Sequence, residues 1–186
     1  MKVRNIITAL LGALLVAGCG VSAPVTTTTS QASQPQRKPS APLLNLELAF
    51  VQPEVDASKY GSAEVLLQRL SQNPSGMGKN EFYAASMGSE PGSATFNKVY
   101  ETAVKYYPAD ELVNLNRASA RMQQGDYSGA KTYLDKAGNS AAAVYSRGVW
   151  YARQGNIQQA VTYFRKAGDM GYPKAETAIQ AIASAR

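Results

Sequence analysis

Histidine is absent from the 186 residues of the sequence. It is the side chain that most often serves as a general base and as a metal ligand, so its absence removes the commonest route to both chemistries. The sequence also lacks a paired nucleophile and base, a cluster of metal-ligating residues and a glycine-rich phosphate loop. These absences argue against enzymatic activity. We therefore expect no cofactor and no bound metal.

Cysteine and net charge are both scarce. Cys19 is the only cysteine, so the chain cannot form an internal disulfide. The formal charge is only +6, and the basic residues are scattered among acidic ones. This distribution is typical of a solvated surface and does not predict a nucleic-acid partner.

The N-terminus has the pattern of an export signal. Lys2 and Arg4 precede an apolar run over residues 6–16, which is shorter than the roughly 20 residues that a membrane span needs. A short positive region followed by such a run is typical of a signal peptide. The run ends in Leu-Val-Ala-Gly-Cys at residues 15–19, which places the sole cysteine directly after two small residues.

These five residues resemble the lipobox of bacterial lipoproteins. The resemblance implies that residues 1–18 are removed, which lowers the formal charge to +4, and that Cys19 is acylated and holds the chain on a membrane. An ordinary secretory signal with a chance cysteine is the alternative. Gly20 follows the cysteine, and no acidic residue appears before Glu47. By resemblance to lipoprotein sorting rules, this favours the outer membrane facing the periplasm over the inner membrane or the cell surface.

Two segments separate the anchor from the helices. Residues 19–42 are polar and punctuated by proline, so we expect a disordered tether. Within residues 43–57, large apolar residues alternate at Leu44, Leu46, Leu48 and Phe50, which predicts a short extended segment or strand. No second strand is evident. We expect its apolar face to pack against a helix over residues 62–70, or beside it, leaving one backbone edge for a partner strand.

From residue 58 onward the pattern is helical, and the fold class is predicted to be all-α. Helices are expected over residues 62–70, 80–87 and 94–107, with breaks at glycine and proline between them. Three carboxylates, Glu101, Asp110 and Glu111, lie near a helix junction. We expect Asp110 to cap the helix that begins at Glu111, which is a structural role and not a catalytic one.

An internal repeat is the strongest signal in the sequence. A shift of 30 residues superposes Gln-Gly-Asp-Tyr-x-x-Ala-x-x-Tyr-Leu-x-Lys-Ala-Gly, which begins at residue 124, on Gln-Gly-Asn-Ile-x-x-Ala-x-x-Tyr-Phe-x-Lys-Ala-Gly, which begins at residue 154. Gly125 and Gly155 are expected to adopt the left-handed turn that ends a first helix. Asp126 and Asn156 are expected to cap a second helix. The small residue Gly148 marks a close helix crossing.

The order of small residue, glycine, alanine, aromatic and alanine at Gly148, Gly155, Ala160, Phe164 and Ala167 resembles the tetratricopeptide repeat family. The resemblance implies a short right-handed α-α superhelix over residues 58–186. Its repeats fall at about 77–108, 109–138 and 139–172, and a capping helix covers 173–185. The step of 30 residues is shorter than the family's usual 34, so the turns between repeats are expected to be clipped.

A narrower likeness joins residues 60–64, Tyr107-Pro108, residues 114–116 and residues 136–138. This layout resembles the C-terminal helical region of Bacteroidales envelope proteins, some of them associated with fimbrial or OmpA-like loci. The likeness implies a compact, lipid-anchored relative of those larger proteins.

The tetratricopeptide resemblance also implies a binding groove, because the first helices of successive pairs line a concave face in that family. The groove positions carried over to this chain are Leu115, Ser119, Met122, Gln123, Tyr145, Val149, Ala152 and Arg153. Packing or solvation is the alternative role for each of them. Trp150 is expected to pack between repeats.

Two functions therefore remain open. One is a membrane-anchored, non-enzymatic adaptor that binds a protein partner, such as an envelope or fimbrial assembly component, in the groove. The other is a structural spacer that tethers the outer membrane to a cell-wall, fimbrial or β-barrel component without using the groove. The sequence does not name the partner.

Overall fold

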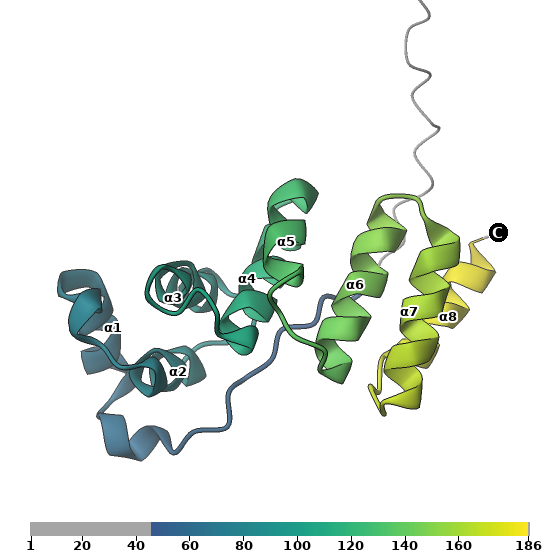
Figure 1. Cartoon of the computed structure of the whole chain (residues 1–186). Helices are drawn as coiled ribbons and strands as arrows, with labels where there is room; N and C mark the ends of the chain where they lie inside the picture. The colour runs from purple at the N-terminus through teal and green to yellow at the C-terminus, as the bar shows by residue number, and fades with distance from the viewer. Residues whose placement is uncertain (1–45, 186) are drawn as a thin grey trace, which may run out of the picture. The chain divides into compact units, whose positions relative to one another are not determined.

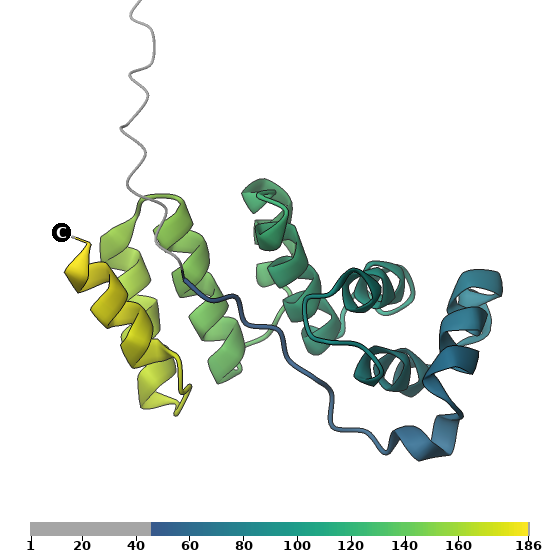
Figure 2. The same cartoon turned by 180° about the vertical axis from the view of Figure 1, so that it is seen from behind.

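The computed structural model describes residues 46–185, and within this range the chain is all-helical (Figures 1 and 2). The predicted fold class is thus confirmed at the level of helix content. Two short 3-10 helices, η1 (Ala57–Tyr60) and η2 (Pro74–Gly76), flank the first α-helix. The α-helices are α1 (Ala63–Gln72), α2 (Lys79–Met87), α3 (Ala94–Tyr106), α4 (Glu111–Gln123), α5 (Tyr127–Leu134), α6 (Ala141–Arg153), α7 (Ile157–Asp169) and α8 (Ala175–Ser184).

The predicted signal peptide, Cys19 and the predicted tether through residue 42 lie outside the described residues. Among residues 46–185, no helix is both long and apolar enough to cross a membrane.

Each α-helix packs against the next one along the chain. The contact between α5 and α6 is less extensive than the contacts within the pairs α4–α5 and α6–α7. Each of the three predicted repeats contains one such pair: α2–α3, α4–α5 and α6–α7. The last helix, α8, packs on α7. Trp150 of α6 donates its indole N–H to the carbonyl of Tyr127 at 2.7 Å and so joins two repeats, as predicted.

The turn glycines and the helix caps predicted from the repeat are found at the expected positions. Gly125 and Gly155 have φ values of 77° and 74°, which side chains with a Cβ rarely adopt. Asp126 accepts a hydrogen bond from the amide of Gly129 at 2.8 Å, and Asn156 accepts one from the amide of Gln159 at 3.2 Å. The pairs α4–α5 and α6–α7 therefore each turn on a glycine and start their second helix on a side-chain cap.

Asp110 caps α4, also as predicted. Its Oδ1 accepts from the amide of Val113 at 3.0 Å and from the hydroxyl of Tyr83 at 2.6 Å. Lys79 lies 3.1 Å from its Oδ2. Burial tends to raise the pKa of Asp110, but the hydrogen bonds from Tyr83 and Val113 and the ammonium of Lys79 hold it below its ordinary value. The carboxylate joins α2 to α4 and needs no catalytic explanation.

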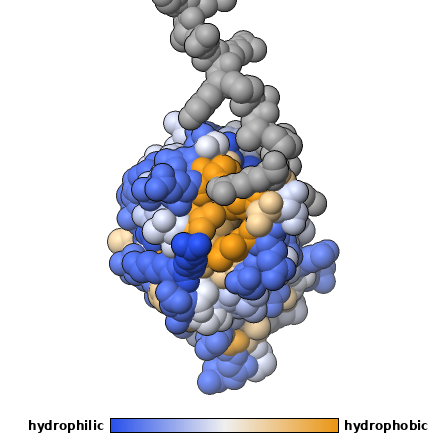
Figure 3. Space-filling model, turned by 90° about the vertical axis from the view of Figure 1, so that its right-hand side faces the viewer, coloured by the Kyte–Doolittle hydropathy of each residue, from blue (hydrophilic) through white to orange (hydrophobic). Residues whose placement is uncertain are grey.

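The α8 end of the described chain retains an apolar surface. Figure 3 shows apolar side chains gathered on the face that α7 and α8 form. Val161, Ile179 and Ile182 line a hollow of about 550 Å³ there, together with the polar residues Gln158, Thr162 and Arg165. α8 therefore covers one side of α7 without burying all of its apolar stripe.

The crossing of α6 and α7 depends on a position without a side chain. A Cβ built at Gly148 would lie 2.6 Å from the ring of Phe164, which is fully buried. Gly168 of α7 is different, because a Cβ there would meet Ala175 at an ordinary 3.6 Å. The two helical glycines thus differ in the space around them.

Gly148→Ala is expected to lower the free energy of unfolding by about 1–3 kcal/mol, because Phe164 must move away from the added methyl group. The matched control, Gly168→Ala, is expected to leave it unchanged or raise it by up to about 1 kcal/mol, because the unfolded chain loses freedom. Urea denaturation followed by circular dichroism measures both. Equal stability of the two variants would contradict the close crossing.

Candidate functional site: the inner face of α4, α6 and α8

Residues 46–51, hereafter the groove segment, are extended and run beside α6 and α4 toward the start of the helical array (Figure 2). The segment forms no β-ladder within the described residues. The prediction that the segment's apolar face packs against or beside the helix over residues 62–70 is wrong for Leu46 and Leu48, and only Phe50 packs against the cluster that contains Leu66 and Leu70. The segment's two buried side chains, Leu46 and Ala49, belong to the apolar core that α4 to α8 share. We call the surface beneath the segment the inner face of α4, α6 and α8.

The predicted alternation of buried side chains is also wrong. Leu46 and Ala49 are buried at 3% and 1% exposure, whereas Leu48 and Phe50 are only half-buried. Leu44 lies outside the described residues. The buried positions are three residues apart, because no neighbouring strand imposes the two-residue period of a pleated sheet. The small Ala49 lies where the segment comes closest to the helices.

Side chains of α4 and α6 hold the segment by its main chain. Asn116 grips Val51 at both ends: its Oδ1 accepts from the amide of Val51 at 2.8 Å, and its Nδ2 donates to the carbonyl at 2.7 Å. Ser119 donates its hydroxyl to the carbonyl of Ala49 at 2.5 Å. Asn116 and Ser119 are both fully buried on α4. They supply the hydrogen bonds that the buried main chain would otherwise lack.

α6 provides the other two contacts with the main chain. Tyr145 donates its hydroxyl to the carbonyl of Glu47 at 3.0 Å, and Arg153 donates to the carbonyl of Leu46 at 3.4 Å. The Tyr145 ring packs against Phe164 and Tyr172, with centroids 5.1 and 4.5 Å away. Burial raises the pKa of the Tyr145 hydroxyl above its ordinary value, so the hydroxyl stays protonated and keeps its donor.

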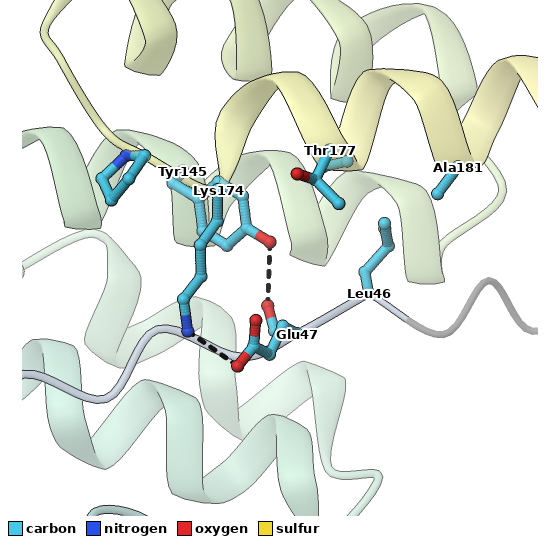
Figure 4. Close-up of a pocket in the computed structure, with 8 residues that line it drawn as sticks. Leu46, Glu47, Tyr145, Lys174, Thr177 and Ala181 are labelled. Atoms are coloured by element: carbon cyan, nitrogen blue, oxygen red, sulfur yellow. Dashed lines mark hydrogen bonds and ion pairs between the residues drawn. The ribbon is translucent and has the colours of Figure 1, made fainter.

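The first residues of the segment also contact the α8 end of the inner face (Figure 4). Leu46 lies beside Thr177 and Ala181 of α8, and these residues line a hollow of about 340 Å³ together with Tyr145. The ammonium of Lys174 lies 2.7 Å from a carboxylate oxygen of Glu47. Both charged groups are largely exposed, so this pair contributes no more than about 1 kcal/mol.

The eight predicted groove residues lie on α4 and α6, and the structure brings most of them under the segment. Leu115, Met122, Val149 and Ala152 are buried in the same apolar core as Leu46 and Ala49, and Ser119, Tyr145 and Arg153 bond to the segment's carbonyls. Gln123 differs: it is exposed and accepts a hydrogen bond from Asn97 of α3 at 2.8 Å. The predicted groove is therefore not empty in this structure, since the chain's own residues fill it.

Sequence reasoning missed Asn116 and Lys174. Asn116 is fully buried in the middle of α4, where a polar side chain is costly unless it has partners. An asparagine in the apolar stripe of a predicted helix was the signal that could have found it. Lys174 precedes α8, which the sequence identified only as a capping helix.

Contacts of the seated segment oppose the entropy cost of ordering it. Five hydrogen bonds at about 1 kcal/mol each and a buried leucine at about 2 kcal/mol stabilise it. Leu48, Phe50 and Val51 add partly buried apolar contacts. Ordering six residues costs about 1–2 kcal/mol for each, so the opposing contributions are of the same order of magnitude.

The chain matches no family model, and comparison with curated proteins and with solved structures finds no match. Within residues 46–185, no group of three or more acidic residues, histidines or cysteines is placed to hold a metal ion. The inner face is therefore interpreted from its own geometry, and that geometry is suited to holding an extended main chain.

Asn116→Ala is expected to speed hydrogen exchange of the Val51 amide by at least about fivefold, because the variant removes a hydrogen bond worth about 1 kcal/mol. Gln123→Ala is the control: it lies on the same helix but bonds to Asn97 instead of the segment. Exchange measured by NMR at single amides tests both. An unchanged exchange rate of the Val51 amide in Asn116→Ala would contradict the role of Asn116 in holding the segment.

Proposed function

We propose that this chain is a membrane-anchored, non-enzymatic adaptor of the bacterial envelope, and that it binds an extended segment of a partner protein on the inner face of α4, α6 and α8. One observation carries the proposal: side chains of two helices grip an extended main chain through five hydrogen bonds. Such bonds recognise the peptide backbone, so they suit a partner segment as well as the chain's own.

The helix pairs support a tetratricopeptide-type architecture as part of this proposal. The glycine turns at Gly125 and Gly155 and the close crossing at Gly148 agree with such repeats, whereas the 30-residue step is shorter than their usual 34 residues. A right-handed superhelix and a relation to Bacteroidales envelope proteins remain proposals that rest on the sequence resemblance.

The anchor is the second part of the proposal. Acylation of Cys19 would hold the chain on the outer membrane, facing the periplasm, and residues 20–42 would serve as its tether. Several buried acyl chains, at about 0.8 kcal/mol for each methylene, hold a protein on a membrane stably.

The alternative is a structural spacer that links the outer membrane to a cell-wall, fimbrial or β-barrel component. The observation that favours it is that the groove segment already fills the inner face. In a spacer the segment would simply join the tether firmly to the helices, and the face would have no other occupant.

Cys19→Ser is expected to release the protein from the membrane and to leave the signal peptide uncleaved by the lipoprotein peptidase. Fractionation and mass spectrometry of the N-terminus measure both. Retention in the membrane with normal processing would rule out the anchor.

Arg153→Glu is expected to lower crosslinking of the partner in intact membranes by at least about fivefold, because it removes a hydrogen bond worth about 1 kcal/mol and places a carboxylate beside the main-chain carbonyl that Arg153 contacted. Arg165→Glu is the matched control, since it makes the same charge change on the exposed surface of α7. Quantitative mass spectrometry of the crosslinked proteins compares the two variants. An equal loss in both would show a general charge effect, and no loss in either would favour the spacer.

A further inference from the structure

We propose that the groove segment is an exchangeable occupant of the inner face and that the partner's binding element is an extended segment with the same spacing, which displaces it. This inference rests on the proposed function, and it adds the chemistry of the partner and the means by which the site is controlled.

The contacts themselves indicate an exchangeable occupant. Every hydrogen bond from α4 and α6 ends on a main-chain atom of the segment, which another peptide would present equally well. Only Leu46 and Ala49 are buried by their side chains. The stabilising contacts and the ordering cost are of the same order of magnitude, so a second peptide can compete. Residues 46–51 contain no cysteine, so no disulfide within the chain holds the segment on the helices.

The contacts on the inner face also determine which residues the competing peptide must contain. At the first position it accepts a leucine, beside Tyr145 and α8. The next residue faces Lys174, which favours an acidic side chain. The fourth residue must be small, because Ala49 is 1% exposed and its carbonyl bonds to Ser119. The fifth is aromatic in this chain, and Phe50 meets the ring of Phe96 edge-on at 5.8 Å.

Covalent attachment gives the groove segment an advantage over any free peptide. A tethered segment competes at an effective concentration in the millimolar range, so the site is open only in the fraction of molecules whose segment has left. The apparent affinity for a partner falls by that same fraction. A substitution that weakens binding of the groove segment and leaves the helices unchanged should therefore tighten binding of a free peptide with the segment's sequence.

The experiment uses a fluorescent peptide with the sequence of residues 45–52 and the full chain, with fluorescence anisotropy as the readout. Ala49→Arg cannot seat its side chain in the closed space that Ala49 occupies, so the segment is expected to leave. The peptide should then bind at least about tenfold more tightly than it binds the unmodified chain. Gln52→Arg is the matched control, because it adds the same charge at an exposed position just beyond the segment. It should bind the peptide as the unmodified chain does.

Two further arms identify the site. A peptide with arginine in place of its alanine should not bind Ala49→Arg, and adding Arg153→Glu to Ala49→Arg should reverse the gain. Circular dichroism and a cooperative melt show that each variant is folded. Where Ala49→Arg does not fold, Leu46→Ala replaces it, and a gain of at least about threefold is expected from the smaller perturbation. A folded segment variant that binds the peptide no better than the unmodified chain overturns the proposal.

The outcomes also separate this inference from the proposed function. If Arg153→Glu lowers partner crosslinking while Ala49→Arg does not raise peptide binding, the inner face serves a partner but the segment does not control it. If the unmodified chain forms dimers by light scattering and Ala49→Arg abolishes them, the occupant is the segment of a second copy, and the proposal of a different partner is overturned.

Discussion

A buried main chain must have hydrogen-bond partners, and this requirement organises the inner face of α4, α6 and α8. Burial of Leu46 and Ala49 brings the backbone of residues 46–51 against the helices. The carbonyls that lose water are met by Ser119, Tyr145 and Arg153, and Asn116 meets both polar groups of Val51. The segment thereby explains why the polar residues Asn116 and Ser119 are fully buried on α4.

The same helix serves the segment and the repeat. On α6, Tyr145 points to the segment, while Gly148 three residues later lets Phe164 of α7 approach. The ring of Tyr145 also packs on Phe164. The position of the Tyr145 hydroxyl is thus set by how α6 and α7 cross, and the grip on the main chain depends on repeat packing. This dependence is why small residues at the crossing matter to the site as well as to stability.

Sequence reasoning succeeded where the determining contacts are local. Gly125, Asp126 and Asp110 act on residues within one helical turn, so their roles could be read from residue type and spacing. Most of the groove positions carried over from the family resemblance also lie on the faces of α4 and α6 that contact the segment. The occupant of those faces could not be inferred, because Val51 bonds to a residue 65 positions away and Leu46 to one 107 positions away. Alternating leucines suggested a strand, but within the segment only Leu46 and Ala49, three residues apart, are buried.

The position of the groove segment in the chain links its binding on the helices to the length of the tether. Residues 46–51 stand between the proposed tether and the helices, so the helices are reached from the membrane only through them. Release of six extended residues adds about 20 Å to the tether, at roughly 3.3–3.6 Å for each residue. When the segment is seated, four of its carbonyls accept hydrogen bonds from the helices. The seated segment therefore offers a partner strand no complete edge for pairing. Binding at the inner face and reach from the membrane would then be coupled, because one segment cannot both fill the groove and lengthen the tether.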